Sequence, residues 1–235
     1  MFCDASDILH NVMVVQTLLN EIEKKDLDIL KTHWIEEVYD YNAKKIIYLE
    51  HEEENTWLHG KIFRKSFLID NNINFHPSLR IHEDSYFLGI ASIYTQKIAI
   101  INIFSYIWKF SFESLTRKNK GEYYFTGAKD FIKSISIVNN IIAEKSPEEL
   151  PYRVCQFFMY MYFYMHNPRW NTEYPELLIE TENYLVEQIQ PFWHIWQNAD
   201  QNFLIQLYAQ ERYRNNCNWI DEETLSQWIK RIGLN

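Results

Sequence analysis

Two acidic groups stand just before apolar runs in this sequence of 235 residues, Asp4-Ala5-Ser6-Asp7 and Glu83-Asp84. Carboxylates that meet in one place can hold a divalent cation, because hard cations take oxygen ligands. A carboxylate can instead act as a general base toward a hydroxyl nucleophile. Acids at the start of a helix also cap it and compensate its dipole, so a purely structural role stays open for both groups. His82, beside the second group, either tunes those acids, binds the same cation or fills a structural position.

Basic residues form two clusters in a chain that is acidic overall. The first cluster begins at an aromatic–Gly–Lys turn, and the second lies beside a Ser-Leu-Thr sequence. Either cluster could bind the phosphates of an anionic substrate, and either could be an ordinary solvated surface. The first contains Lys61, Arg64 and Lys65, after Trp57 and Gly60; the second contains Lys109, Arg117, Lys118 and Lys120, around Ser114-Leu115-Thr116.

Composition limits the classes of fold and function. Apolar residues make up 47% and aromatic residues 17% of the chain, which is enough to bury a substantial core. Only 5 Gly and 6 Pro are present, which favours a helix-rich fold. The net charge of −9 argues against a nucleic-acid-binding surface, because such a surface needs a basic face.

Cysteine usage and apolar runs indicate a cytoplasmic protein without a membrane span. Cys3, Cys155 and Cys217 form no C-x-x-C pair and are odd in number, which favours neither a zinc site nor a disulfide framework. A reducing, cytoplasmic compartment is therefore expected. The N-terminus lacks the features of a signal peptide, and the most apolar run, residues 154–165, is about half the length that crosses a bilayer.

The first half of the chain alternates between helix and strand patterns. Asp7 is a plausible N-cap for a helix whose apolar face includes Val12, Val15 and Leu18. Runs rich in β-branched and aromatic residues predict strands. We expect strands at residues 27–34, 45–50, 97–103 and 105–110, and helices at residues 61–69 and 83–94.

The second half carries only helix patterns. We place a boundary near residues 118–121, which gives an α/β domain over residues 1–118 and an all-helical domain over residues 119–235. The sheet should be mixed and flanked by helices. We expect helices around residues 131–142, 151–166, 176–189, 201–213 and 221–231, the last with Asp221 as its N-cap.

Taken together, the motifs resemble those of family 2 glycosyltransferases with a GT-A fold. That family has a D-x-D-D motif after a strand, an aromatic–Gly–Lys segment followed by basic residues, and an E-D-x-x-F motif about twenty residues on. A Y-x-Y-R segment leading to S-hydrophobic-T follows. The corresponding stretches are Asp4 to Asp7, Trp57 to Lys65, His82 to Phe87, and Tyr106 to Lys109 leading to Ser114-Leu115-Thr116.

The resemblance covers about residues 1–118 and implies transfer of a sugar from a nucleotide-sugar to a hydroxyl acceptor with inversion. It implies that Asp84 is the catalytic base with Glu83 beside it, and that Mg²⁺ or Mn²⁺ is held by Asp4, Ser6 and Asp7. The donor and acceptor would contact the remaining motif residues. These substrate-binding residues are Trp57, Gly60, Lys61, His82, Lys109 and Ser114.

Two departures from the family pattern leave a second hypothesis open. Ser6 replaces a metal-binding Asp, and a hydroxyl is a poorer ligand for a hard cation, so metal affinity should be weakened. No counterpart of the family's opening strand–helix units, which hold the nucleotide, precedes Asp4, so we expect a partial GT-A sheet with an open strand edge. A protein partner could supply or replace that half. The alternative function is that of a catalytically degenerate binding or assembly factor. A third hypothesis is that the chain is a structural helical protein in which the motif matches arise by chance.

Overall fold

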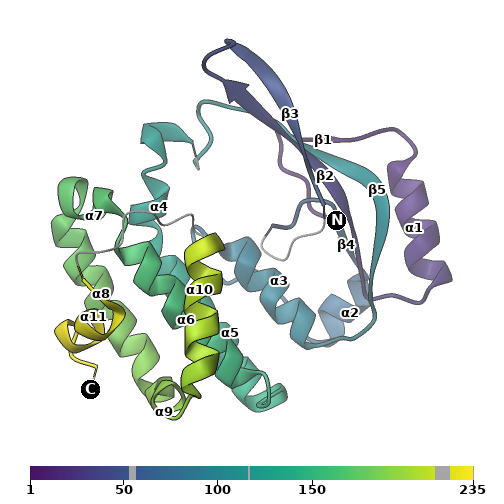
Figure 1. Ribbon diagram of the computed structural model, residues 1–235. Helices are drawn as coiled ribbons and strands as arrows, with labels where there is room; N and C mark the ends of the chain where they lie inside the picture. Colours follow the sequence, from purple (N-terminus) through teal and green to yellow (C-terminus); the bar gives the residue numbers. More distant parts are fainter. Residues whose placement is uncertain (53–56, 116, 215–222, 235) are drawn as a thin grey trace. The chain divides into compact units, whose positions relative to one another are not determined.

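The computed structural model describes residues 1–52, 57–115, 117–214 and 223–234 (Figure 1). The chain divides into two compact units. The sheet unit comprises Met1–Leu79 and Glu83–Gly121, and the helical unit comprises Arg80–His82 and Glu122–Asn235.

The sheet unit is organised on β2, which has a neighbour along both of its edges (Figure 1). One edge pairs in parallel with β5, and the outer edge of β5 pairs with the short, antiparallel β1. The other edge of β2 pairs with two antiparallel strands in succession, first β4 and then β3. The strands are β1 (Ile8–Leu9), β2 (Ile29–Asp40), β3 (Lys45–His51), β4 (Lys61–Phe63) and β5 (Ile98–Trp108).

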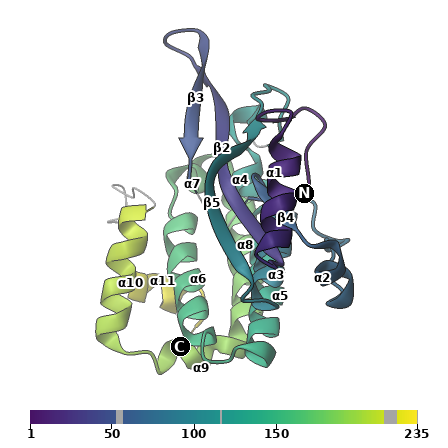
Figure 2. The ribbon, with the colours of Figure 1, turned by 90° about the vertical axis from the view of Figure 1, so that its right-hand side faces the viewer.

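Helix α1 (Val14–Lys24) covers one face of this sheet, and Figure 2 shows it lying lengthwise beside the strands. Its buried residues Val14, Leu18 and Ile22 recur every four positions, which places them on one side of the helix. They pack with Leu30 of β2 and Ile62 of β4. Burial of these side chains fixes the helix on the strands.

Two further helices of the sheet unit follow β4, and the second carries the acidic pair. Helix α2 covers Lys65–Asp70, and helix α3 covers Glu83–Ile93 with Glu83 and Asp84 in its first turn. Phe87 anchors α3, because its ring lies 5.3 Å from Phe63 and 4.7 Å from Phe75. The acidic pair is therefore placed by a buried aromatic residue one turn further along the helix.

The helical unit is built around α6, which packs with α5, α8, α9 and α10. Ten of its residues are buried, and most of them are aromatic or methionine. Large, rigid aromatic side chains fill such a core with few rotamer losses. The helices of this unit are α4 (Tyr123–Thr126), α5 (Ala128–Lys145), α6 (Leu150–Met165), α7 (Pro168–Glu173), α8 (Pro175–Ile189), α9 (Trp193–Gln197), α10 (Gln201–Arg214) and α11 (Leu225–Arg231), with short 3₁₀ turns at Gln190–Phe192 and, in the sheet unit, Lys118–Lys120.

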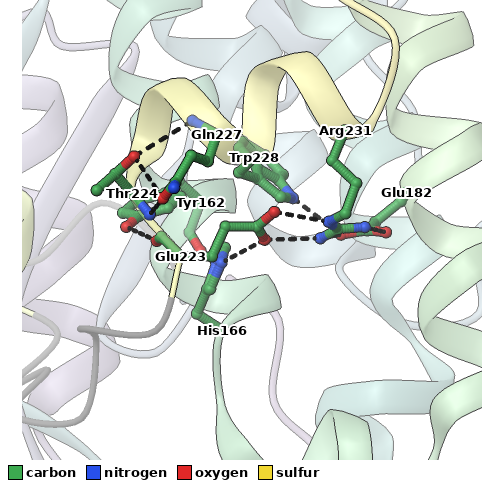
Figure 3. Close-up of polar contacts among 8 residues, drawn as sticks. All are labelled: Tyr162, His166, Glu182, Glu223, Thr224, Gln227, Trp228 and Arg231. Carbon is green, nitrogen blue, oxygen red and sulfur yellow. Dashed lines mark hydrogen bonds and ion pairs between the residues drawn. The ribbon is translucent and has the colours of Figure 1, made fainter.

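A charged network holds the last helix, α11, on this core (Figure 3). Arg231 donates two hydrogen bonds of 2.8 Å to Glu182, and it also contacts both carboxylate oxygens of Glu223 at 2.8 and 3.0 Å. The indole N–H of Trp228 donates to Glu182 at 2.8 Å, and His166 lies 3.2 Å from Glu223. The carboxylates of this network are thus paired.

The fold confirms the prediction of a mixed α/β region with a partly formed sheet, followed by helices, as expected for a partial GT-A fold. Two of the predicted elements are wrong in type or extent. Residues 61–63 form β4 and not the start of a helix, because they pair with β2 at Ile29–Lys31. Residues 97–103 and 105–110 are not separate strands, because β5 runs continuously beside β2 despite a register shift near Thr32 and His33.

Asp7 is not the N-cap of the first helix, which begins seven residues later after Met13. At the other end of the chain, Thr224 caps α11 and forms a capping box with Gln227. Asp221, the predicted cap, lies outside the described residues, as do Thr116 and Cys217. Within the described ranges, no helix is both long and apolar enough to cross a membrane.

Candidate functional site

Among the described acids of the sheet unit, Asp84 has the most strongly perturbed pKa. Burial is the main cause, followed by the negative charges of Glu83 and Asp4, and together they raise the pKa of Asp84 to about 7. The backbone N–H of Leu58 and the ammonium of Lys61 act in the opposite direction, because they favour the ionised form. A carboxyl group with a pKa near neutrality can both accept and return a proton at physiological pH.

The turn before β4 brings Leu58 and Lys61 to this carboxylate. Gly60 has a φ of +66°, and a Cβ at this position would lie 2.8 Å from the hydroxyl of Thr32 and 2.9 Å from its carbonyl oxygen. The carbonyl oxygen of Gly60 accepts hydrogen bonds from the N–H and the hydroxyl of Thr32, at 2.9 and 2.8 Å. Glycine is therefore needed for the close approach of this turn to β2.

Lys61 is almost completely buried, with 2% of its surface exposed. Its ammonium donates a hydrogen bond of 2.5 Å to the backbone carbonyl oxygen of Trp57. A buried cation near the partly buried carboxylate of Asp84 lowers the cost of ionising that carboxylate. The predicted substrate-binding residues Trp57, Gly60 and Lys61 thus lie in the turn that supports Asp84.

A second part of the site connects the N-terminal acidic group with β5 through Tyr106. The hydroxyl of Tyr106 accepts a hydrogen bond from the N–H of Asp4 at 3.2 Å and donates one to Asp7 at 2.6 Å. The other carboxylate oxygen of Asp7 accepts the N–H of Lys109 at 2.9 Å. Both oxygens of Asp7 are therefore bound within the protein, which explains why this residue caps no helix.

Asp4 differs from Asp7 in its surroundings. Burial, followed by the charge of Asp7, raises the pKa of Asp4. Ser6 is exposed. Within the described part of the chain, no group of three or more His, Cys, Asp or Glu residues is arranged to hold a metal ion. The motif can still fit a cation that is bound mainly through a diphosphate, because Mg²⁺ commonly takes only one or two protein carboxylates beside substrate phosphates.

Two basic residues of the predicted second cluster, Lys109 and Arg117, form ion pairs with carboxylates of β2. Lys109 forms an ion pair with Glu37, which also accepts the N–H of Phe110 at 3.1 Å. Burial alone would raise the pKa of Glu37, but these hydrogen bonds lower it. Arg117 contacts Glu36 at 3.1 Å. These two cations are therefore partly neutralised in the protein.

Other predicted residues lie elsewhere. Arg64 of the first basic cluster contacts Asp26 at 3.0 Å and the carbonyl oxygen of Leu27 at 2.9 Å. Ser114 lies in the turn after β5, where its carbonyl oxygen accepts from two backbone N–H groups. His82 is grouped with the helical unit and packs 5.0 Å from Phe131; burial lowers its pKa to about 4.

Sequence reasoning missed two residues that shape the site. The sequence indicates Tyr106 only as part of a motif, although its hydroxyl joins Asp4 and Asp7. His59 was not singled out, yet it is buried and stacks 5.0 Å from Tyr106. No local signal distinguishes these residues, because their partners lie about 50 to 100 positions away in the chain.

Comparison with solved structures shows the fold of a glycosyltransferase. No protein-family model and no curated protein sequence matches the chain. Residues 1–349 of Staphylococcus aureus TarS, a glycosyltransferase, superpose with a TM-score of 0.54 at 14% identity, covering 93% of this chain and 67% of that one. The TarS complex with UDP superposes with a TM-score of 0.57 at 12% identity, covering 93% of this chain and 67% of that one. The TarS complex with UDP-GlcNAc superposes with a TM-score of 0.56 at 15% identity, covering 92% of this chain and 67% of that one. These likenesses show that the fold of this chain is similar to that of a glycosyltransferase.

Proposed function

We propose that this protein transfers a sugar from a nucleotide-sugar donor to a hydroxyl acceptor with inversion, using Asp84 as the general base. The observation that carries the proposal is the raised pKa of Asp84 at the start of α3, within a fold shared with a glycosyltransferase. In the step, the acceptor oxygen forms a bond to the anomeric carbon while the bond to the diphosphate breaks. Asp84 takes the proton of the acceptor hydroxyl.

The surroundings of Asp84 suit this task. Burial and the charge of Glu83 make the carboxylate basic enough to accept a proton, while Lys61 and the N–H of Leu58 keep it available in its ionised form. The efficiency of a general base is greatest when its pKa is near the working pH. Glu83 is thus assigned the role of tuning Asp84 through its charge.

We further propose that a divalent cation, Mg²⁺ or Mn²⁺, is bound with the donor and that Asp4 supplies its protein carboxylate. Such a cation would neutralise the charge of the leaving diphosphate. Asp7 would act through Tyr106, because both of its own oxygens accept hydrogen bonds. Ser6 would contribute weakly at most, since a hydroxyl is a poorer ligand for a hard cation.

The test is a transfer assay with UDP-, GDP- and dTDP-sugars, with and without Mn²⁺, together with calorimetric titration of each donor. UDP-GlcNAc is included because TarS has been crystallised with it. Transfer should occur with one donor, and NMR of the product should show the opposite anomeric configuration to the donor. Donor binding without transfer to any acceptor would contradict the catalytic role.

The alternative is a binding or assembly factor that keeps the fold and has lost transfer. Two observations favour it, namely Ser6 in the metal motif and the pairing of Lys109 and Arg117 with carboxylates of β2. Under this alternative, Asp84→Ala would leave the cellular function intact while substitutions of exposed apolar residues abolish it. Loss of the cellular function in Asp84→Ala, with the function retained after substitution of exposed apolar residues, would support the transferase function.

A further inference from the structure

Four aromatic side chains of the sheet unit surround the ring of His59, and we call these five rings the aromatic cluster. They come from β2, from the turn before β4 and from β5. The ring of His59 lies 4.9 Å from Trp34, 5.0 Å from Tyr106, 5.1 Å from Trp108 and 6.0 Å from Trp57. Trp34 and His59 are buried, with 2% and 8% exposure, whereas Trp57 and Trp108 are partly exposed. The cluster therefore has a closed interior and an accessible side.

Three buried nitrogen atoms in and beside the cluster have no hydrogen-bond partner in the described structure. They are Nε1 of Trp34, Nδ1 of His59 and Nη1 of Arg117. Arg117 lies beside the aromatic cluster, because its guanidinium is 4.1 Å from the centre of the Trp108 ring. A buried polar group without a partner is unfavourable. Three of them together indicate a place where oxygen atoms of water or of a ligand are expected.

The aromatic cluster is directly connected to the candidate base. Leu58, whose N–H acts on Asp84, lies between Trp57 and His59 in the chain. Tyr106, which stacks on His59, binds the N–H of Asp4. A molecule resting on the cluster would therefore lie beside the carboxylate that is assigned to the acceptor hydroxyl.

The rings of the aromatic cluster are themselves uncharged, although the ammonium of Lys61 lies near His59. Burial, followed by the charges of Lys61, His51 and Arg117, lowers the pKa of His59 to about 4, so the imidazole is neutral at pH 7. The charge of Arg117 is paired with Glu36. Aromatic faces combined with neutral hydrogen-bonding groups suit a ligand that has apolar C–H faces and hydroxyl groups at its edges.

We propose that the aromatic cluster is the acceptor subsite and that it binds a carbohydrate, with a sugar ring against Trp57 and Trp108 and hydroxyl groups toward His59 and Trp34. The inference rests on the proposed function, because it takes Asp84 as the base that accepts the proton of the acceptor. It adds the chemical class of the acceptor and the residues that select it.

The experiment is saturation-transfer difference NMR on the full chain with N-acetylglucosamine, glucose and sorbitol as probes, and UDP as a separate probe. The wild-type protein should transfer saturation to the C–H protons of at least one carbohydrate. Trp57→Ala should weaken that binding at least fivefold, and Trp57→Phe should restore most of it. UDP binding should be unchanged in both variants. Tyr213→Ala, which removes an aromatic residue that is 88% exposed in the helical unit, is the matched control.

His59→Phe separates ligand binding from packing. Phenylalanine keeps a ring between Trp34 and Tyr106 and removes the unpartnered nitrogen. The melting temperature should therefore be equal or higher, while carbohydrate binding falls at least threefold. Unchanged carbohydrate binding in this variant would indicate that Nδ1 of His59 binds a water molecule and not the carbohydrate, which would overturn the proposal.

Two other results would also overturn it. Wild-type protein that binds UDP and none of the carbohydrates has no such subsite, although the proposed transferase function would stand. A loss of UDP binding in Trp57→Ala would place the donor on the cluster. Carbohydrate binding that depends on Trp57, in a protein that shows no transfer with any donor, would support the subsite and contradict the enzyme.

Discussion

Two carboxyl groups, Glu223 beside α11 in the helical unit and Asp84 of α3 in the sheet unit, have pKa values that their surroundings shift in opposite directions. In the helical unit, Glu182 is buried and accepts from Arg231 and Trp228, and Arg231 is shared with Glu223 (Figure 3). Burial alone would raise the pKa of Glu223, but hydrogen bonds from Arg231 and His166 lower it. Glu223 is thereby stabilised in its charged form.

In the sheet unit, burial brings two titratable groups toward their neutral forms. The pKa of Asp84 is raised to about 7 and that of His59 is lowered to about 4, and burial is the largest cause of both shifts. Nitrogen atoms of His59 and Trp34 are also buried without partners. Strongly perturbed and incompletely paired groups are typical of functional sites, whereas fully paired networks are typical of structural ones. This difference supports the proposal that the sheet unit carries the chemistry and that the network around α11 is structural.

The largest expected effect is the decrease in the transfer rate caused by the substitution Asp84→Asn. Loss of a general base should lower the transfer rate by about 10²–10⁴-fold, while the variant retains its fold. Rates should be measured at saturating donor, with circular dichroism as the folding control. Transfer within threefold of wild type would remove Asp84 from the role of base and weaken the contrast between the units.

The second prediction concerns pH. Because the base must be ionised, transfer should rise with pH through about 7 and should be about 100-fold slower at pH 5 than at pH 8. The pH–rate profile of the wild-type protein is the measurement. A flat profile between pH 5 and 8 would show that no group with this pKa limits the reaction.

The same raised pKa has a consequence for stability. The folded state binds the proton of Asp84 more tightly than the unfolded chain does, whose pKa is 3.8, so stability falls as pH rises from about 4 through about 7. Asp84→Asn should therefore be more stable than wild type at pH 8 and equal to it near pH 4. A shift of about three pKa units corresponds to about 4 kcal/mol, and we expect about 2 kcal/mol because the Asp84 side chain is partly exposed and its interactions are screened. Urea unfolding at both pH values tests this; lower stability of the variant at pH 8 would contradict the assignment of Asp84 as a destabilised carboxylate.

In the helical unit, Glu182→Ala should reduce the free energy of unfolding by about 2 kcal/mol without changing the transfer rate per folded molecule. The substitution leaves the indole N–H of Trp228 without its acceptor and Arg231 with one carboxylate fewer. Part of the loss is screened, because the Arg231 side chain is 47% exposed. Glu180→Ala is the matched control, since Glu180 is 62% exposed and should change stability by less than about 0.5 kcal/mol.

The smallest expected effect is that of Tyr106→Phe, at about 1 kcal/mol of stability. It removes the hydrogen bond from the hydroxyl to Asp7 and leaves the ring against His59. Since Asp7 would then be freer to bind a cation, the concentration of Mn²⁺ needed for half-maximal transfer should shift. An unchanged dependence on Mn²⁺ would show that Tyr106 does not act on the acidic group.

The sequence by itself determined the class of fold and the position of the acidic pair. Helices α5, α6, α8 and α10 follow from apolar periodicity, which is a local property of the chain. Glu83 and Asp84 were predicted to begin a helix, and they do. Whether these residues act in transfer stays a prediction, because the fold alone does not decide it.

Only the tertiary structure decided which groups meet. The propensity of residues 61–63 for helix was overridden by pairing with β2, some thirty positions earlier. Asp7 does not cap the first helix, and its carboxylate instead accepts a hydrogen bond from Tyr106, which is 99 residues away in the chain. The basicity of Asp84 likewise depends on burial and on Asp4, which are properties of the folded chain. Periodicity and composition describe a residue's neighbours in sequence, whereas pKa and hydrogen bonding depend on its neighbours in space.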